Sequence, residues 1–227
     1  MPEVEPVENR ALVIASGLRY DAMTMTTQLQ YPDSDLEALR QTDKRLAGVI
    51  DRMGRLEWGL NPDLFSALVT SIVSQQISSQ AADTVCARLL AVLGEMTPSA
   101  VDETPVETIQ QCGMSMRKAR YIKAAGEAVH SRRIDLTSLV DCSDEVVVER
   151  LTRLPGIGVW TAEMMLIFSL GRPDVLSYGD LAIRRGLSDL HGHKDMPRDR
   201  FERYRRRYSP YCSLASLYLW KLADTPS

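Results

Sequence analysis

The sequence predicts an all-α protein. Apolar residues recur at steps of three and four along most of the chain, which is the spacing of one helix face, and the alternation typical of strands is scarce. The chain has 227 residues, of which 44% are hydrophobic and 25% are charged. That composition is enough for one substantial core or for two modest lobes that share a cleft.

The first helix is expected to begin at Asn-Pro-Asp, residues 61–63, where Asn is a favourable N-cap and Pro fits the first helical position. It is expected to end within residues 75–78. Ser78 or Ser79 can cap the next helix, and Gly94 is a typical C-terminal stop. These signals delimit two consecutive helices.

Further helices follow from the same apolar pattern. Asp144 precedes an apolar run that Pro155 and Gly156 break, and the next run ends before Gly171 and Pro173. A strongly basic stretch separates the last two helices, and residues 1–33 show no readable pattern. The expected spans are 117–130, 144–154, 161–170, 181–190 and 211–221.

A glycine-rich turn joins two of these helices. Residues 154–162 read Leu-Pro-Gly-Ile-Gly-Val-Trp-Thr-Ala, and the glycines allow a tight turn without Cβ clashes. The helix that follows begins with free N–H groups, and such a helix start binds anions. We therefore expect the N–H groups of Gly156, Ile157 and Gly158 to hold one DNA phosphate without reading sequence. The alternative is an ordinary corner between two helices.

Asp180 lies downstream of this turn, in Ser-Tyr-Gly-Asp-Leu at residues 177–181, just before a helical run. An aspartate at this place is a good N-cap. It is also a candidate for catalysis, and the two roles are compatible because a cap fixes the orientation of the carboxylate. The sequence alone leaves both open.

The order of helix, Gly-x-Gly turn, helix and downstream Asp resembles the helix-hairpin-helix DNA glycosylase superfamily over residues 61–221. Ser-Gln-Gln-Ile-Ser at 74–78, Trp160, and Arg-Arg-Gly at 184–186 are most similar to the bacterial 3-methyladenine DNA glycosylase II branch, the AlkA-type alkylbase enzymes. The resemblance implies a two-lobed helical bundle with a DNA-binding cleft between the lobes. Its lobes are expected at 61–171 and at 1–60 plus 172–227, without the N-terminal β domain of the longer bacterial enzymes.

The resemblance also implies a reaction, the hydrolysis of the N-glycosidic bond of an alkylated purine in base excision repair. An ionised Asp180 would stabilise the positive charge that develops on the deoxyribose and would orient the attacking water. Bifunctional relatives carry a lysine at the second residue after the hairpin's last glycine, and here that residue is Trp160. We therefore expect a hydrolase without lyase activity, which leaves an abasic site.

A flipped base needs a pocket, and an aromatic ring suits a cationic alkylated base. Trp160, Tyr211 and Met164 are the candidates, and core packing is the alternative for each ring. Gln76 is expected to fill the gap that flipping leaves in the duplex. Its alternative role is to bond loop backbone.

Cofactors are expected to be absent, apart from a bound Na⁺ or K⁺ that the resemblance places on the backbone carbonyls of Thr152, Leu154 and Ile157. Iron–sulfur relatives need four clustered C-terminal cysteines, and only Cys212 lies in that part of the chain. Because no cysteine spacing matches a metal site, we expect free thiols of a reducing cytoplasm at Cys86, Cys112, Cys142 and Cys212.

The net charge of −3 excludes a protein that coats nucleic acid by bulk charge, so DNA contact must be local. The basic clusters at 117–120, 184–185 and 198–207 are candidates for phosphate contacts. We expect a monomer that binds double-stranded DNA containing alkylated bases in a bacterial cytoplasm. No apolar run approaches the roughly 18 residues of a membrane span. The competing hypotheses are a glycosylase for another lesion and a non-catalytic DNA-binding module.

Overall fold

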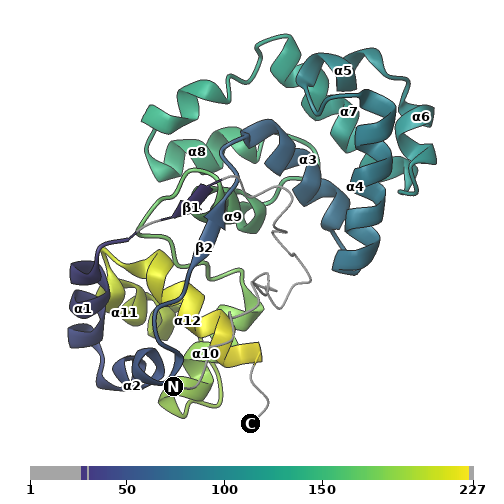
Figure 1. Ribbon diagram of the computed structural model, residues 1–227. Coiled ribbons are helices and arrows are strands. Elements are labelled where there is room, and N and C mark those ends of the chain that lie inside the picture. Colours follow the sequence, from purple (N-terminus) through teal and green to yellow (C-terminus); the bar gives the residue numbers. More distant parts are fainter. Residues whose placement is uncertain (1–26, 30, 225–227) are drawn as a thin grey trace, which may run out of the picture.

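The computed structural model describes residues 27–29 and 31–224 (Figure 1). Within those residues nearly all regular structure is helical, which confirms the predicted all-α class. The strands of this described part are β1 (Thr27–Leu29) and β2 (Trp58–Leu60), an antiparallel pair with Gln28 opposite Gly59. The predicted lack of an N-terminal β domain stays a prediction, since residues 1–26 lie outside the described residues.

The helices in chain order are α1 (Asp33–Thr42), α2 (Lys44–Met53), α3 (Leu64–Ser74), α4 (Ser79–Leu93), α5 (Pro98–Glu103), α6 (Val106–Gln111), α7 (Met116–His130), the 3-10 helix η1 (Thr137–Asp141), α8 (Asp144–Leu151), α9 (Val159–Phe168), α10 (Leu181–His191), α11 (Arg198–Tyr208) and α12 (Cys212–Asp224).

The helices pack in two groups (Figure 1). In one group α3 contacts α4, α7 and α9, while α5 and α6 contact α7, and α8 contacts α9. In the other, α10 contacts α12 and α2, and α11 contacts α1 and α12. The predicted lobes at 61–171 and at 1–60 plus 172–227 stay a prediction, because residues 1–26, 30 and 225–227 lie outside the described residues.

The two groups share one core. The rings of Phe168 in α9 and Trp220 in α12 stack with their centroids 5.5 Å apart. The N–H of Asn61 donates to the carbonyl of Phe168 at 2.8 Å. At Gly186 a Cβ would lie 2.5 Å from the carbonyl oxygen of Leu219, so glycine is what lets α10 and α12 approach so closely.

Capping side chains set most helix starts. Ser78 caps α4 and Asp180 caps α10, as the sequence predicts. The start of α3 was predicted wrongly. Asp63, rather than Asn61, accepts the N–H groups of Phe65 and Ser66, and Asn61 instead accepts the N–H of Asp63 in a turn ahead of the helix.

Several helices were missing from the sequence prediction, including α1, α2, α5, α6 and α11. The basic stretch at 198–207, which the sequence analysis places between the last two helices, forms the helix α11. Its Phe201, Tyr204 and Tyr208 are buried at helical spacing, so the stretch has one apolar face beneath its arginines.

Candidate active site and DNA-binding hairpin

The turn between α8 and α9 needs glycine at only one of its two glycine positions. Gly156 has φ +84°, and a Cβ there would lie 2.3 Å from Cδ2 of Tyr121. Gly158 has φ −94°, and nothing lies within 4 Å of the place of its Cβ. The prediction that both glycines relieve turn clashes is therefore wrong for Gly158. The fold leaves that position open to an approaching group.

The N–H groups of the turn differ in their availability. The Ile157 N–H donates to the carbonyl of Leu154 at 3.1 Å, which corrects the prediction that it serves a phosphate. The N–H groups of Gly156 and Gly158 make no hydrogen bond within the described part of the chain, and no side chain caps α9. This uncapped helix start can bind an anion.

Asp180 is buried, with 3% of its surface exposed. Its Oδ1 accepts the N–H of Ile183 at 2.9 Å, so the N-cap role is real. Its Oδ2 accepts the indole Nε1–H of Trp160, also at 2.9 Å. The two predicted site residues therefore meet directly, and the indole comes from α9, the helix that the hairpin introduces.

A pocket of about 440 Å³ opens beside this pair. The backbone at Gly179 lies close to the Trp160 side chain, since a Cβ at Gly179 would be in ordinary contact with Cβ of Trp160 at 3.5 Å. The residues that line the pocket are Trp160, Gly179, Asp180, Leu181, Ala182, Arg185 and Ala223. The walls are thus mainly apolar, with one carboxylate, one indole ring and the guanidinium group of Arg185.

Two predicted pocket residues do not line this pocket. Met164 lies one turn after Trp160 but is only 1% exposed, because α9 is surrounded by core on that side. Tyr211 precedes the first residue of α12, whereas Ala223, which lines the pocket, lies near the last. At a rise of about 1.5 Å per residue the two are more than about 15 Å apart.

The structure adds contacts that sequence reasoning missed. The Ser177 hydroxyl donates to Glu163. The guanidinium groups of Arg184 and Arg198 both lie over the Tyr178 ring, 5.2 and 5.0 Å from its centroid. Burial raises the pKa of Glu163, and the charge of Asp180 acts in the same direction. These contacts hold the 177–180 segment that carries Asp180. A lone Glu on a helix gave no signal of this role.

Gln76 lies at the break between α3 and α4, with its side chain exposed and φ +60°. It makes no hydrogen bond to the residues that the structure describes. Its neighbour Gln75 does bond backbone: its Nε2–H donates to the carbonyl of Gly156 at 2.8 Å. The Gln76 turn and the hairpin therefore lie side by side, as a shared DNA-binding face requires.

The sequence of this chain matches a family of base excision DNA repair proteins. Its profile, described as the HhH-GPD superfamily, matches residues 69–210, which is more than half of the chain. The chain belongs to the HhH-GPD superfamily. The resemblance predicted from the sequence is thereby confirmed, and the glycine turn lies within the matched residues.

Similar HhH-GPD proteins include DNA-3-methyladenine glycosylase 1 of Schizosaccharomyces pombe, 32% identical over 208 residues that cover 88% of this chain and 91% of the relative. A crystal structure of a DNA-3-methyladenine glycosidase from Bacillus halodurans has a TM-score of 0.79 at 36% identity, covering 88% and 94%. A Schizosaccharomyces pombe 3-methyladenine DNA glycosylase in complex with abasic DNA has a TM-score of 0.71 at 30% identity, covering 84% and 96%.

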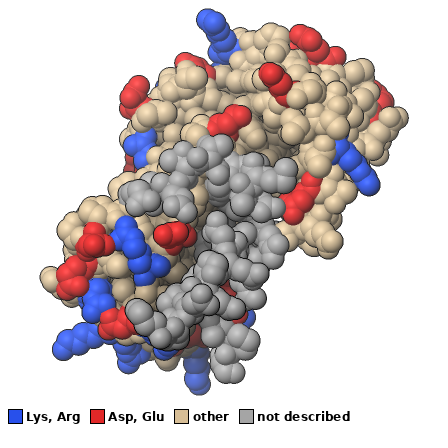
Figure 2. Space-filling model, in the orientation of Figure 1, with Lys and Arg blue, Asp and Glu red and all other residues tan. Residues whose placement is uncertain are grey.

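Other site types find no support in the described part of the chain. No group of three or more His, Cys, Asp or Glu side chains there could hold a metal ion, and no helix there is long and apolar enough to cross a membrane. All four cysteines are free thiols. On the face shown in Figure 2, most Lys and Arg side chains lie over the group with α1 and α2, interspersed with Asp and Glu. The described residues drawn on this face therefore mix both signs of charge.

Proposed function

We propose that this protein is a monofunctional DNA glycosylase that removes 3-methyladenine and 7-methylguanine from double-stranded DNA. The observation that carries the proposal is Asp180, a buried carboxylate in a pocket wall, bonded to an indole at the start of the helix that the hairpin introduces. The names of the similar proteins support 3-methyladenine as a substrate.

In the proposed mechanism the N–H groups of Gly156 and Gly158 bind a phosphate near the lesion and fix the duplex. The damaged nucleotide flips into the pocket, and unstacking costs a few kcal/mol that the contacts offset. Trp160 lines that pocket with an electron-rich ring that attracts a cationic alkylated base. Gln76 fills the vacated place in the stack.

The chemical step uses the charge of Asp180. As the N-glycosidic bond breaks, the deoxyribose becomes positive, and a carboxylate beside it stabilises that charge in a site from which water is mostly removed. The same carboxylate orients the water that attacks the sugar carbon. An alkylated purine already carries a positive charge, so it leaves as a neutral base without a general acid.

A lyase step is not part of the proposal. It needs an amine that attacks the sugar carbon and forms a Schiff base. No lysine lines the pocket among the described residues, and Trp160, at the lysine position of bifunctional relatives, uses its N–H on Asp180. The product is then an intact strand with an abasic site.

We also propose that a Na⁺ or K⁺ ion is held by the carbonyls of Thr152, Leu154 and Ile157, and that the enzyme acts as a monomer. The donor chemistry fits, because carbonyl oxygens bind these ions and Leu154 keeps a free lone pair beside its bond from Ile157. The ion would add positive charge to the hairpin beside the bound phosphate.

The test is base release from DNA methylated in vitro, with the strand analysed before and after alkali. We expect free 3-methyladenine and 7-methylguanine, and strand breaks only after alkali. Breaks without alkali would overturn the hydrolase assignment. Release only from oxidised or mismatched bases would assign another lesion class, and DNA binding without release would favour a binding module.

A further inference from the structure

A lysine on α7 holds the end of α3. The Nζ of Lys118 donates to the carbonyl of Val73 at 2.7 Å and to the carbonyl of Gln75, the residue at which α3 ends. Burial lowers the pKa of Lys118, and the charge of Arg117 lowers it further. A cation on the last carbonyls of a helix is a favourable C-terminal contact.

The segment that Lys118 holds is also tied to the hairpin. The Gln75 amide donates to the carbonyl of Gly156, and Gly156 packs against the ring of Tyr121, one turn along α7 from Lys118. The two segments are thus hydrogen-bonded to each other, and both contact α7, the first through the Lys118 bonds and the hairpin by packing against Tyr121. Gln76 itself has φ +60°, a conformation that non-glycine residues keep only where the surroundings impose it.

We propose that Lys118 and Gln75 are positioning residues, which hold the Gln76 turn at a fixed place relative to the phosphate-binding hairpin. A phosphate bound at Gly158 then puts Gln76 at the gap that the flipped base leaves. This inference rests on the proposed function for the role of Gln76. Neither residue contacts the reacting atoms.

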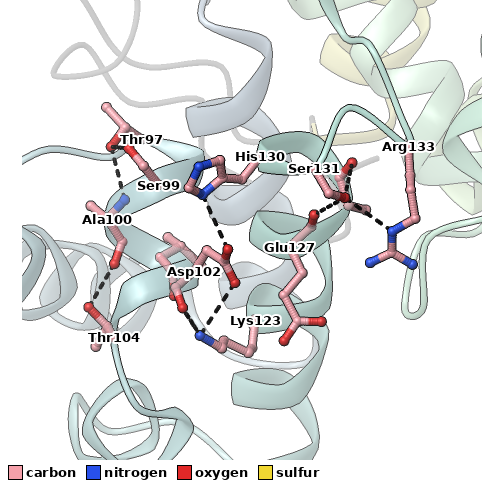
Figure 3. A network of polar contacts seen from close by, with 12 residues as sticks. Thr97, Ser99, Ala100, Asp102, Thr104, Lys123, Glu127, His130, Ser131 and Arg133 are labelled. Carbon is pink, nitrogen blue, oxygen red and sulfur yellow. Dashed lines mark hydrogen bonds and ion pairs between the residues drawn. The ribbon is translucent and has the colours of Figure 1, made fainter.

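The same helix provides a matched control. Lys123 of α7 donates through Nζ to the carbonyls of Val101 and Asp102, near the end of α5, just as Lys118 does at the end of α3. It also pairs with the Asp102 carboxylate at 3.6 Å, and His130 contacts that carboxylate too (Figure 3). Lys118→Met and Lys123→Met therefore remove similar bonds, but only the first lies beside the hairpin.

The activity test compares single-turnover base release from two duplexes, one with the lesion opposite a normal base and one with it opposite an abasic site, where flipping is easier. For Lys118→Met we expect the ratio of the paired to the unpaired rate to fall about 10-fold. Gln75→Leu, which removes only the hairpin bond, should lower the ratio less. Lys118→Arg should restore it, and Lys123→Met should leave it unchanged.

A double-mutant cycle shows whether Lys118 acts through Gln76. Gln76→Ala should lower the ratio, and adding Lys118→Met to it should cause little further loss. Independent, multiplying effects would overturn the proposal, as would equal losses on both duplexes in Lys118→Met.

Insertion can also be observed without catalysis. A 2-aminopurine placed opposite a stable abasic-site analogue should brighten when wild type or Lys123→Met binds, and should stay dim with Lys118→Met or Gln76→Ala. Brightening with Lys118→Met, or its loss with Lys123→Met, would overturn the proposal. Because this measurement needs no base release, it separates failure of this inference from failure of the proposed function.

Discussion

Asp43 and Asp180 are both buried aspartates that cap a helix, yet their surroundings differ. Asp43 is 6% exposed, and its Oδ2 accepts bonds from Arg207 at 2.8 Å and from the Tyr208 hydroxyl at 3.2 Å, with His191 Nε2 at 3.4 Å. Its charge is neutralised inside the protein, where it joins α2 to α10 and α11. Asp43 therefore stabilises the fold.

Asp180 has no such neutralisation. Its Oδ2 accepts one indole N–H, and no ion pair reaches it from the residues that the structure describes. Its charge faces a pocket, and the arginine in the wall of that pocket, Arg185, is paired with Asp189 at 3.6 Å instead. A buried N-cap aspartate can therefore have either of two roles. Where the protein itself supplies the counter-charge, the aspartate stabilises the fold, and where it does not, the charge is left to interact with a ligand.

The largest expected effect is on catalysis. Asp180→Asn should slow single-turnover base release about 100-fold or more, because the carboxylate charge is lost. Stability should fall by only about 1 kcal/mol, since Asn is also a good cap. A base-release rate within 10-fold of the wild-type rate would contradict the catalytic role that separates Asp180 from Asp43.

Asp43→Asn should show the opposite pattern. We expect the free energy of unfolding to fall by about 2–3 kcal/mol, because an amide cannot replace the bonds of a buried carboxylate to a charged partner. Base release by the folded protein should stay close to wild type. Urea unfolding measures the first quantity, and a release assay at equal folded concentration measures the second.

The pH dependence sharpens this prediction. Burial alone would raise the pKa of Asp43, but the bond from Arg207, the charge of His191 and two backbone N–H groups together lower it. The ionised form therefore stabilises the fold above the unfolded pKa of about 3.9, and this stability is lost as the pH falls through the lower folded pKa. The difference between wild type and Asp43→Asn should shrink accordingly below about pH 4, and a constant difference would contradict this account of the pKa.

The two hairpin glycines differ in the same way as the two aspartates: Gly156 is expected to serve the fold and Gly158 to serve DNA binding. Gly158→Ala should leave stability unchanged but weaken DNA binding about 10-fold, because its Cβ would enter the open space in which we propose that a phosphate binds. Gly156→Ala should instead destabilise the protein, since its Cβ meets Tyr121. Equal effects of the two variants on unfolding would contradict the assignment.

The smallest expected effect concerns the indole bond. Trp160→Phe keeps a ring in the pocket but removes the N–H that holds Asp180. Base release should therefore fall about 5-fold, which corresponds to the roughly 1 kcal/mol that a typical hydrogen bond contributes. A loss as large as that of Asp180→Asn would mean that the indole itself takes part in the reaction.

Sequence reasoning found the parts of the site that depend on local patterns. The cap at Asp180, the hairpin and the break at Gln76 all carry signals at fixed spacing. It failed for Met164, whose role depends on the direction of its side chain. Because α9 is buried on several sides, the sequence spacing of Trp160 and Met164 does not show which of the two faces the pocket. The helical character of α11 was hidden by its arginines.

Contacts between distant segments left no signal at all. The amine of Lys118 reaches α3 across 45 residues, and the Ser177 hydroxyl reaches Glu163 from a separate loop. In the sequence Lys118 is one member of a basic cluster, and Glu163 is an ordinary helix residue. Only the fold distinguishes the lysine that holds a turn from its solvated neighbours.

The central claim is that the uncompensated charge of Asp180 stabilises a cation at the sugar, and binding can test it without turnover. Two duplexes suffice, one with a cationic pyrrolidine ring and one with a neutral tetrahydrofuran ring in place of the damaged nucleotide's deoxyribose. Wild type should bind the cationic duplex at least about 10-fold tighter, as expected for a transition-state mimic. Asp180→Asn should bind both equally, whereas an unchanged preference for the cation in that variant would contradict the account.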